Sequence, residues 1–262
     1  MTGIDVQDRR VDTGHGLLFA RLWKGAEASA APILLFHDSL GSVELWRSFP
    51  EKLAAATSRR VIAYDRLGFG RSDPFPGRLA MNFVREEARR IVPLLQEQLG
   101  FSSFIACGHS VGGGMAVETA AHLPENCVGL ITMGAQALVD DRIRDGIRVA
   151  QAEFAKPENL ARLGRYHRDP AWVVSAWIET WLDPAFAGFS LDEALARVRC
   201  PILAVHGQDD EYGSVEHARR IAAVRGEAAI LDGIGHVPHR EDPDRLVSLL
   251  DGFIRDVVAV RA

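Results

Sequence analysis

The chain has 262 residues, a net charge of −5 and 47% hydrophobic residues. This size and composition suit one large buried core, and the absence of a basic stripe argues against a nucleic-acid partner. No apolar run reaches the roughly 18 residues of a membrane span, and residues 1–10 lack the apolar centre of a signal peptide. Cys107, Cys127 and Cys200 lie in or beside predicted buried strands, which favours reduced thiols. We therefore expect a cytoplasmic protein without a membrane partner.

The chain opens with a predicted hairpin from Val11 to Trp23, turning at residues 14–16. Short apolar runs then alternate with segments of helical spacing, as in parallel strands joined by helices. The expected strands cover residues 33–37, 60–64, 103–108, 128–133, 201–206 and 227–231. The expected helices cover residues 43–56, 79–99, 111–122, 215–224 and 242–258. With the hairpin, this predicts an α/β protein whose eight-stranded, mostly parallel sheet has helices on both faces.

The alternation stops between Ala137 and Val198, where the chain is charged, helical in character and without a clear strand. We expect residues 137–198 to be an inserted helical cap, and residues 1–136 and 199–262 to form the core. Trp177 and Trp181 share one helical face of this insertion. Packing within the cap is the default interpretation of these two tryptophans, and the wall of an apolar pocket is the alternative.

One short motif carries the strongest chemical signal. Gly108-His109-Ser110-Val111-Gly112 fits G-x-S-x-G and lies between a predicted strand and a predicted helix. A serine at such a turn has a strained backbone, and side chains at the flanking glycines would collide. Ordinary glycine-rich turns also match this pattern, so Ser110 needs partners before it can be interpreted as a nucleophile. We expect His109 to pack under neighbouring loops without a chemical role.

A nucleophilic serine needs a base, and the base needs a group that orients it. Asp209 and Asp210 follow the predicted strand 201–206, and His236 lies in the loop after the strand 227–231. Loops at the carboxyl ends of strands are where open α/β sheets gather their chemistry. No pair of histidines shows zinc-site spacing, and we expect neither a metal nor another cofactor. We expect a surface or turn position for the remaining histidines that follow no strand: His15, His122, His167 and His217.

These motifs resemble those of the α/β-hydrolase superfamily over nearly the whole chain. Gly207-x-x-Asp210 resembles the acid motif, and Gly235-His236 with Glu241 and Pro243 resembles the histidine motif. Residues 64–72 also resemble a glycine-rich loop of this fold. The resemblance implies that Ser110 is the nucleophile, Asp210 the acid and His236 the base. Asp209 stays open as the acid, because Ser214 stands where the family often has a proline.

The loop after the strand 33–37 reads His37-Asp38-Ser39-Leu40-Gly41. It resembles the Asn-Ser-Leu-Gly loop of enol-lactonases, with Asp38 where the superfamily usually has glycine. The resemblance implies an oxyanion hole built from the N–H groups of Ser39 and Val111, with Leu40 as the alternative to Ser39. A plain turn between strand and helix is the alternative interpretation of this loop.

Together these features predict a cofactor-independent serine hydrolase that cleaves a small-molecule carboxylic ester or lactone through an acyl-enzyme. We expect a monomer or homodimer. Related enzymes cleave carbon–carbon bonds or act as cofactor-free haloperoxidases and perhydrolases, and these activities remain alternatives. A ligand sensor with little turnover is the alternative from another class. Ser110 argues against dehalogenases and epoxide hydrolases, which the resemblance associates with an aspartate nucleophile.

Overall fold

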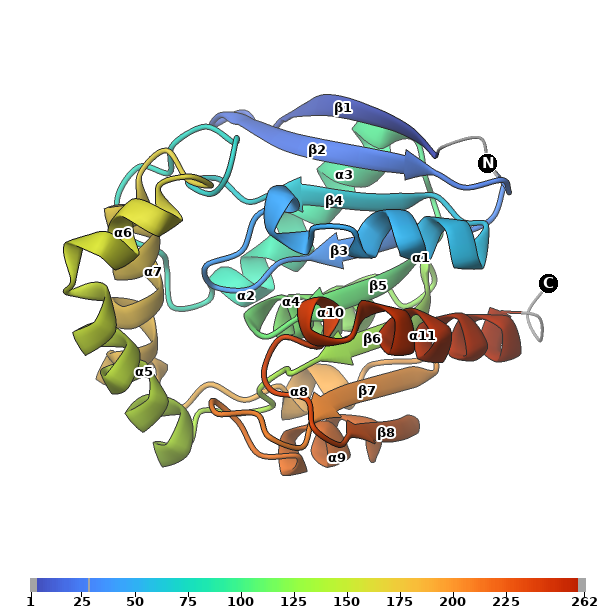
Figure 1. Ribbon diagram of the computed structural model, residues 1–262. Helices are drawn as coiled ribbons and strands as arrows, with labels where there is room; N and C mark the ends of the chain where they lie inside the picture. Colours follow the sequence, from blue (N-terminus) through green and yellow to red (C-terminus); the bar gives the residue numbers. More distant parts are fainter. Residues whose placement is uncertain (1–3, 28, 259–262) are drawn as a thin grey trace.

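The computed structural model describes residues 4–27 and 29–258, which contain an eight-stranded sheet covered by helices on both faces (Figure 1). The strand order is β1-β2-β4-β3-β5-β6-β7-β8, and the pairs β1–β2 and β2–β4 are antiparallel while the others are parallel. The strands are β1 (Asp5–Asp12), β2 (Leu17–Lys24), β3 (Ile33–Phe36), β4 (Val61–Asp65), β5 (Phe104–His109), β6 (Cys127–Met133), β7 (Ile202–Gly207) and β8 (Gly226–Leu231). The predicted fold class is confirmed.

The central strands read as continuous apolar runs because both of their faces are buried. In β3, Leu34 and Phe36 pack into the core on one face of the sheet, and Ile33 and Leu35 pack into the core on the other. The opening hairpin is confirmed, but its first strand begins at Asp5 rather than near Val11. This strand is mostly exposed at the sheet edge, so its residues lack the apolar pattern by which a strand is recognised.

Helices cover the two faces of the sheet, with α1 and α11 packed together on one face and α4 on the other (Figure 1). The covering helices are α1 (Phe49–Thr57), α2 (Phe83–Glu86), α3 (Val92–Leu99), α4 (Val111–His122), α8 (Asp192–Leu195), α9 (Glu216–Ala222), α10 (Pro238–Glu241) and α11 (Pro243–Val258). The helix expected over residues 43–56 is divided into a 3₁₀ turn, Val43–Trp46, and α1, because Arg47 has a φ of 54° that interrupts it. A π-helical segment, Glu87–Ile91, joins α2 to α3. Among the described helices, none has the length and apolar content to cross a membrane.

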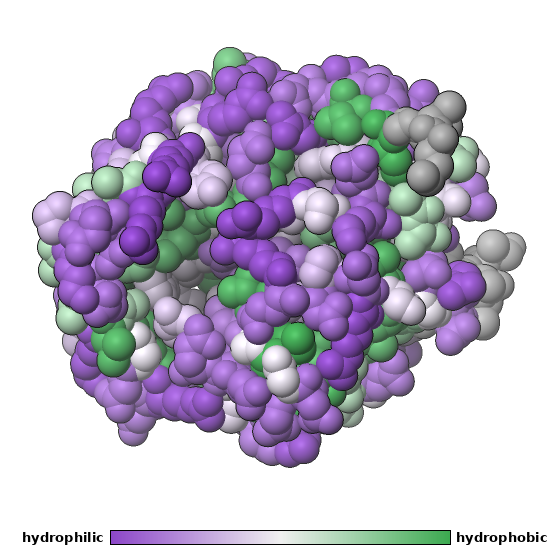
Figure 2. All heavy atoms as spheres, in the orientation of Figure 1, coloured by the Kyte–Doolittle hydropathy of each residue, from purple (hydrophilic) through white to green (hydrophobic). Residues whose placement is uncertain are grey.

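Between β6 and β7 the chain forms the inserted helices, a name used here for α5 (Asp141–Phe154), α6 (Pro157–Leu163) and α7 (Pro170–Leu182). A proline stands at the first position of α6 and α7, where its missing N–H costs no hydrogen bond. The inserted helices lie beside the end of the sheet where the parallel strands finish (Figure 1). The space-filling view shows a hollow between them and the sheet (Figure 2). The division of the chain into core and cap remains a prediction.

Two of the histidines expected at surface or turn positions, His167 and His217, are buried, so a surface position is wrong for both. His167 Nδ1 accepts the Gly70 N–H at 2.9 Å, and His167 Nε2 donates to Leu40 O at 3.0 Å. His217 Nδ1 accepts the Ala137 N–H at 3.3 Å. Each histidine therefore joins the insertion or its start to a segment distant in sequence, a contact that local sequence patterns do not reveal.

Candidate active site

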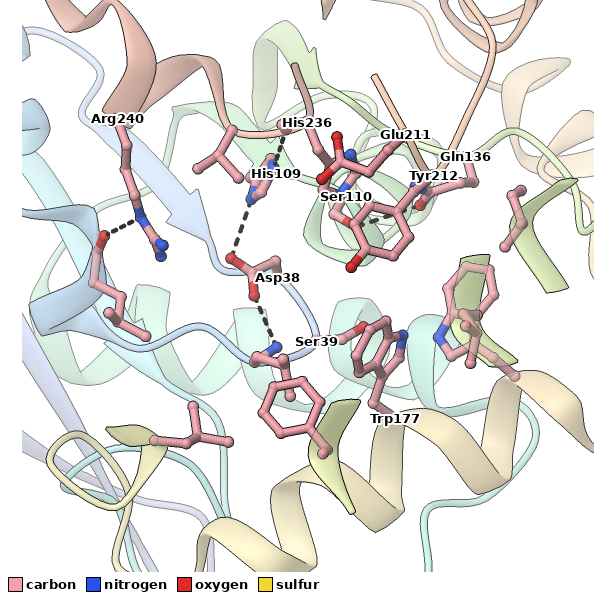
Figure 3. A pocket seen from close by; sticks show the side chains of 18 of the residues that line it. Asp38, Ser39, His109, Ser110, Gln136, Trp177, Glu211, Tyr212, His236 and Arg240 are labelled. Atoms are coloured by element: carbon pink, nitrogen blue, oxygen red, sulfur yellow. Dashed lines mark hydrogen bonds and ion pairs between the residues drawn. The ribbon is translucent and has the colours of Figure 1, made fainter. Parts of the chain in front are cut away.

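Ser110 occupies a sharp turn between β5 and α4, with φ 54° and ψ −124°. This conformation is rare for a residue with a side chain, so the surrounding structure must hold it in place. A Cβ on Gly108 would lie 2.0 Å from Gly112 O, and one on Gly112 would lie 2.1 Å from Phe36 O. The two glycines flanking Ser110 are therefore required by close backbone contacts. The Ser110 side chain faces the pocket at the N-terminus of α4 (Figure 3).

Asp210 and His236 form a buried pair at the ends of β7 and β8. His236 Nδ1 donates to Asp210 Oδ2 at 2.8 Å, and His206 Nε2 lies 3.1 Å from the same oxygen. The N–H groups of Tyr212 and Gly213 donate to Asp210 Oδ1 at 2.8 and 3.1 Å. Burial alone would raise the pKa of Asp210, but the hydrogen bonds from His206 and His236 lower it well below its usual value. Asp210 is therefore an ionised acceptor that holds His236 in one orientation.

Because its Nδ1–H is held by Asp210, His236 in this tautomer has Nε2 as the nitrogen that can accept a proton. Burial disfavours the charged imidazole, but the hydrogen bond and charge of Asp210 outweigh burial, and the pKa of His236 lies above its usual 6.5. The Tyr212 ring packs against the His236 ring with 4.9 Å between centroids. Asp209, the alternative acid, is exposed, and its N–H donates to Ile234 O. The geometry thus brings Asp210 to His236 and leaves Asp209 outside the pair.

The hydroxyl of Ser110 faces a residue that the sequence analysis did not identify. Ser110 Oγ donates to Gln136 Oε1 at 3.4 Å, and within the described residues no hydrogen bond joins Ser110 to His236. Gln136 is buried and follows the carboxyl end of β6. Its place after a central strand was the available signal, because side chains at such ends converge on one edge of the sheet.

The peptide between Asp38 and Ser39 has a fixed orientation. The Asp38 carbonyl oxygen accepts hydrogen bonds from Arg66 Nη2 at 2.9 Å, His37 Nδ1 at 2.8 Å and Gly41 N at 3.2 Å. The peptides of the described chain are trans, so the Ser39 N–H points away from this carbonyl. These three donors on one side of the peptide direct the Ser39 N–H toward the other side.

The same loop distinguishes the two candidate donors of the oxyanion hole. The Leu40 N–H donates to Asp38 Oδ1 at 2.8 Å, so it is already used. No hydrogen bond within residues 4–27 and 29–258 takes the Ser39 N–H, and Ser39 lines the pocket. Val111 is the first residue of α4, where a helix leaves its N–H groups without an intrahelical partner. The geometry therefore favours Ser39 over Leu40 as the partner of Val111.

His109 is buried behind this loop and contacts the partly exposed Asp38. His109 Nδ1 lies 3.1 Å from Asp38 Oδ2, and His109 Nε2 lies 2.8 Å from the His236 carbonyl oxygen (Figure 3). Burial would raise the pKa of Asp38, but the hydrogen bond from His109 and neighbouring positive charge, including that of Arg240, hold it well below its usual value. The His109 ring is therefore held between two acceptor oxygens. His109 is buried as expected, and its contact with Asp38 is an addition to that expectation.

The pocket has a volume of about 390 Å³ and lies between the inserted helices and the carboxyl ends of the strands. Its apolar wall includes side chains from the inserted helices: Ile143, Ile147, Phe154, Leu163, Trp177 and Trp181. Trp181 also packs on Phe186 at 5.3 Å, so both interpretations of these tryptophans hold. Its charged side chains are Asp38, Arg162, Glu211 and Arg240. Among the described residues, no group of three or more His, Cys, Asp or Glu residues is arranged to hold a metal ion.

Comparison with known proteins identifies relatives over most of the chain. A model of the alpha/beta hydrolase family matches residues 33–249. The serine hydrolase BPHL of Mus musculus is 28% identical to this chain, in a match that covers 92% of this chain and 84% of BPHL. The 2-hydroxymuconate semialdehyde hydrolase of Pseudomonas sp. strain CF600 is 26% identical, in a match that covers 87% of this chain and 88% of that hydrolase. Among solved structures, a thermophilic esterase from Thermogutta terrifontis has a TM-score of 0.74 at 21% identity and covers 96% of this chain and 99% of its own.

Proposed function

The chain belongs to the alpha/beta hydrolase family, and we propose that it is a serine hydrolase that cleaves a small-molecule carboxylic ester or lactone through an acyl-enzyme. One observation carries this proposal: Ser110, at a strained strand-to-helix turn, shares a pocket with a His236 whose Nδ1–H is held by buried Asp210. This is the arrangement that activates a serine hydroxyl, because the acid fixes the tautomer of the base.

The proposed reaction begins when Ser110 Oγ leaves Gln136 and attacks the substrate carbonyl carbon, while His236 Nε2 takes the hydroxyl proton. The N–H groups of Ser39 and Val111 donate to the negative oxygen of the tetrahedral intermediate. When the intermediate collapses, the C–O bond to the leaving group breaks and His236 returns the proton to that oxygen. Water, deprotonated by His236, then attacks the acyl-enzyme and releases the acid and the free serine.

We further propose that residues 137–198 act as a cap over this site. The inserted helices supply much of the apolar wall, including Trp177 and Trp181, so a bound molecule would be shielded from bulk water. An apolar wall over a polar reaction centre suits a neutral acyl or ring portion of a small molecule.

Carbon–carbon bond hydrolysis is the second candidate function. It is favoured by one finding, the 26% identity to a protein named 2-hydroxymuconate semialdehyde hydrolase over most of both chains. Both reactions need a base on His236 and a pocket that stabilises negative oxygen, so the site serves either. Substrate comparison separates them.

The test measures turnover of short-chain 4-nitrophenyl esters and of simple lactones by wild type and by Ser110→Ala. We expect wild type to turn over these substrates. Where deacylation is slow, it should also release a burst of 4-nitrophenol equal to the enzyme concentration. Ser110→Ala should show neither the turnover nor the burst. Cleavage of a vinylogous diketone without ester or lactone turnover would establish the second candidate. Tight binding of such ligands without turnover would replace both with a sensor.

A further inference from the structure

We propose, on the basis of the hydrolase function proposed above, that the substrate carries a carboxylate in addition to the bond that is cleaved, and that Arg240 binds this carboxylate. A monoester of a dicarboxylic acid or a lactone with a carboxylate side chain has the required chemistry. Four features of the pocket support the proposal: the free terminal nitrogens of Arg240, the engagement of Asp38 by other groups, the partial burial of the Arg240 side chain, and the position of Glu211.

Arg240 places a guanidinium group in the pocket wall with most of its donors unused. It lies in the last turn of α10, and its Nε donates to Leu45 O at 3.1 Å. Within residues 4–27 and 29–258, its two terminal nitrogens take part in no hydrogen bond or ion pair. The single contact through Nε fixes the stem of the side chain and leaves its planar end available.

The carboxylate that shares this wall takes no hydrogen bond from Arg240. Both oxygens of Asp38 are engaged by other groups, Oδ1 by the Leu40 N–H and Oδ2 by the His109 ring. The charge of Arg240 helps to lower the pKa of Asp38, but within the described residues the two side chains form no ion pair. In Figure 3, Arg240 and Ser110 are drawn on opposite sides of Asp38, so the guanidinium lies to one side of the nucleophile.

The surroundings of Arg240 make an anion a favourable ligand. The side chain is partly buried, and Leu45 and Val237 line the pocket beside it. Water that solvates the guanidinium there is limited, and a carboxylate can accept two parallel hydrogen bonds from its fork. Arg162, the other arginine of the pocket, is exposed on α6 and therefore remains solvated.

A carboxylate near the catalytic histidine would be repelled, which gives the substrate a direction. Glu211 lines the pocket on the His236 side, where a Cβ added to Gly235 would lie 3.5 Å from Glu211 Oε2. Glu211 is exposed, so water weakens its repulsion, but its charge still makes this side of the pocket less favourable for an anionic group than the Arg240 side. The apolar wall of the inserted helices then takes the uncharged part of the molecule.

The experiment compares two esters that differ in charge: mono-4-nitrophenyl glutarate and 4-nitrophenyl valerate. The measured quantity is the ratio of their kcat/KM values in wild type, Arg240→Gln, Arg240→Lys and Arg162→Gln, with Arg245→Gln as an exposed control outside the pocket. We expect Arg240→Gln to lower the glutarate-to-valerate ratio about 10- to 100-fold, chiefly through KM for the glutarate ester, as expected for a lost charge-assisted hydrogen bond. Arg240→Lys should recover part of the ratio, because it keeps the charge but not the fork.

A ratio that stays within threefold in Arg240→Gln, or that falls in Arg162→Gln instead, overturns the proposal. Calorimetry with monomethyl glutarate and methyl valerate on Ser110→Ala, with and without Arg240→Gln, separates this proposal from the hydrolase function. Binding of monomethyl glutarate that depends on Arg240, without turnover of either ester by wild type, would refute the hydrolase function and retain the anion site. Turnover of both esters with no dependence on Arg240 would retain the function and refute the anion site.

Discussion

Replacing Asp38 tests whether its side chain holds the loop of residues 37–41. Asp38→Ala removes the acceptor of the Leu40 N–H and the partner of the buried His109 Nδ1. Each loss leaves a polar group unsatisfied and costs about 1–3 kcal/mol, so the two together cost about 2–6 kcal/mol. Because the Asp38 side chain is 18% exposed, we take the middle of this range, about 4 kcal/mol in all. For a chain of this length that lowers Tm by roughly 8–16 °C.

The matched control is Asp38→Asn. Its amide oxygen can still accept the Leu40 N–H, and its amide nitrogen can donate to His109 Nδ1, while neutral His109 still donates to the His236 carbonyl. We expect this variant to lose less than about 2 kcal/mol. In kinetic assays, Asp38→Ala should also lose about 100- to 1,000-fold in kcat if the Ser39 N–H is misplaced. Calorimetry of thermal unfolding measures the stability of both variants. Equal losses of stability in Asp38→Ala and Asp38→Asn, or an Asp38→Ala protein as stable as wild type, would show that the Asp38 side chain does not hold this loop.

Further predictions concern Asp210, His236 and the turn that holds Ser110. Asp210→Asn should lower kcat about 10⁴-fold, because it favours the wrong tautomer of His236. In the matched control, Asp209→Asn at an exposed position, kcat should stay within about threefold of wild type. The reverse order in steady-state kinetics would make Asp209 the acid. The raised pKa of His236 predicts an acid limb of kcat/KM with its midpoint above pH 6.5, and a midpoint below that value would contradict the geometry. Because its pKa is raised in the folded protein, charged His236 stabilises the fold. This contribution to the free energy of unfolding is complete below pH 6.5 and is lost as the pH rises through the folded pKa, so stability falls where kcat/KM rises. Gly112→Ala should destabilise the fold and abolish turnover, because its Cβ would lie 2.1 Å from Phe36 O. A variant that is active and that calorimetry finds as stable as wild type would disprove the close contact.

The sequence predicts the sheet well because its central strands obey a simple rule. Strands buried on both faces, such as β3 and β5, must be continuous apolar runs, and the loops after them can be located without knowing any contact. Ser110 and Asp210 follow such strands, β5 and β7, and His236 follows the parallel edge strand β8, so their convergence at one end of the sheet is also predictable. Their chemical roles remain predictions that the structure supports by geometry.

The rest of the site depends on contacts between segments distant in sequence. Gln136 meets Ser110 across two strand ends, and Arg240 enters the pocket because of the path taken by α10. The contacts of His109 follow only from the fold, because one of its two acceptors lies 127 residues away along the chain. Local spacing carries none of this information, because tertiary packing determines which polar groups become neighbours.

The central claim is that Ser110 is an activated nucleophile served by His236. Labelling with a fluorophosphonate probe, measured by intact mass on wild type, Ser110→Ala and His236→Ala, tests it most directly. The account predicts one adduct on wild type and none on either folded variant. No adduct on folded wild type, or an adduct that persists in Ser110→Ala, would contradict it.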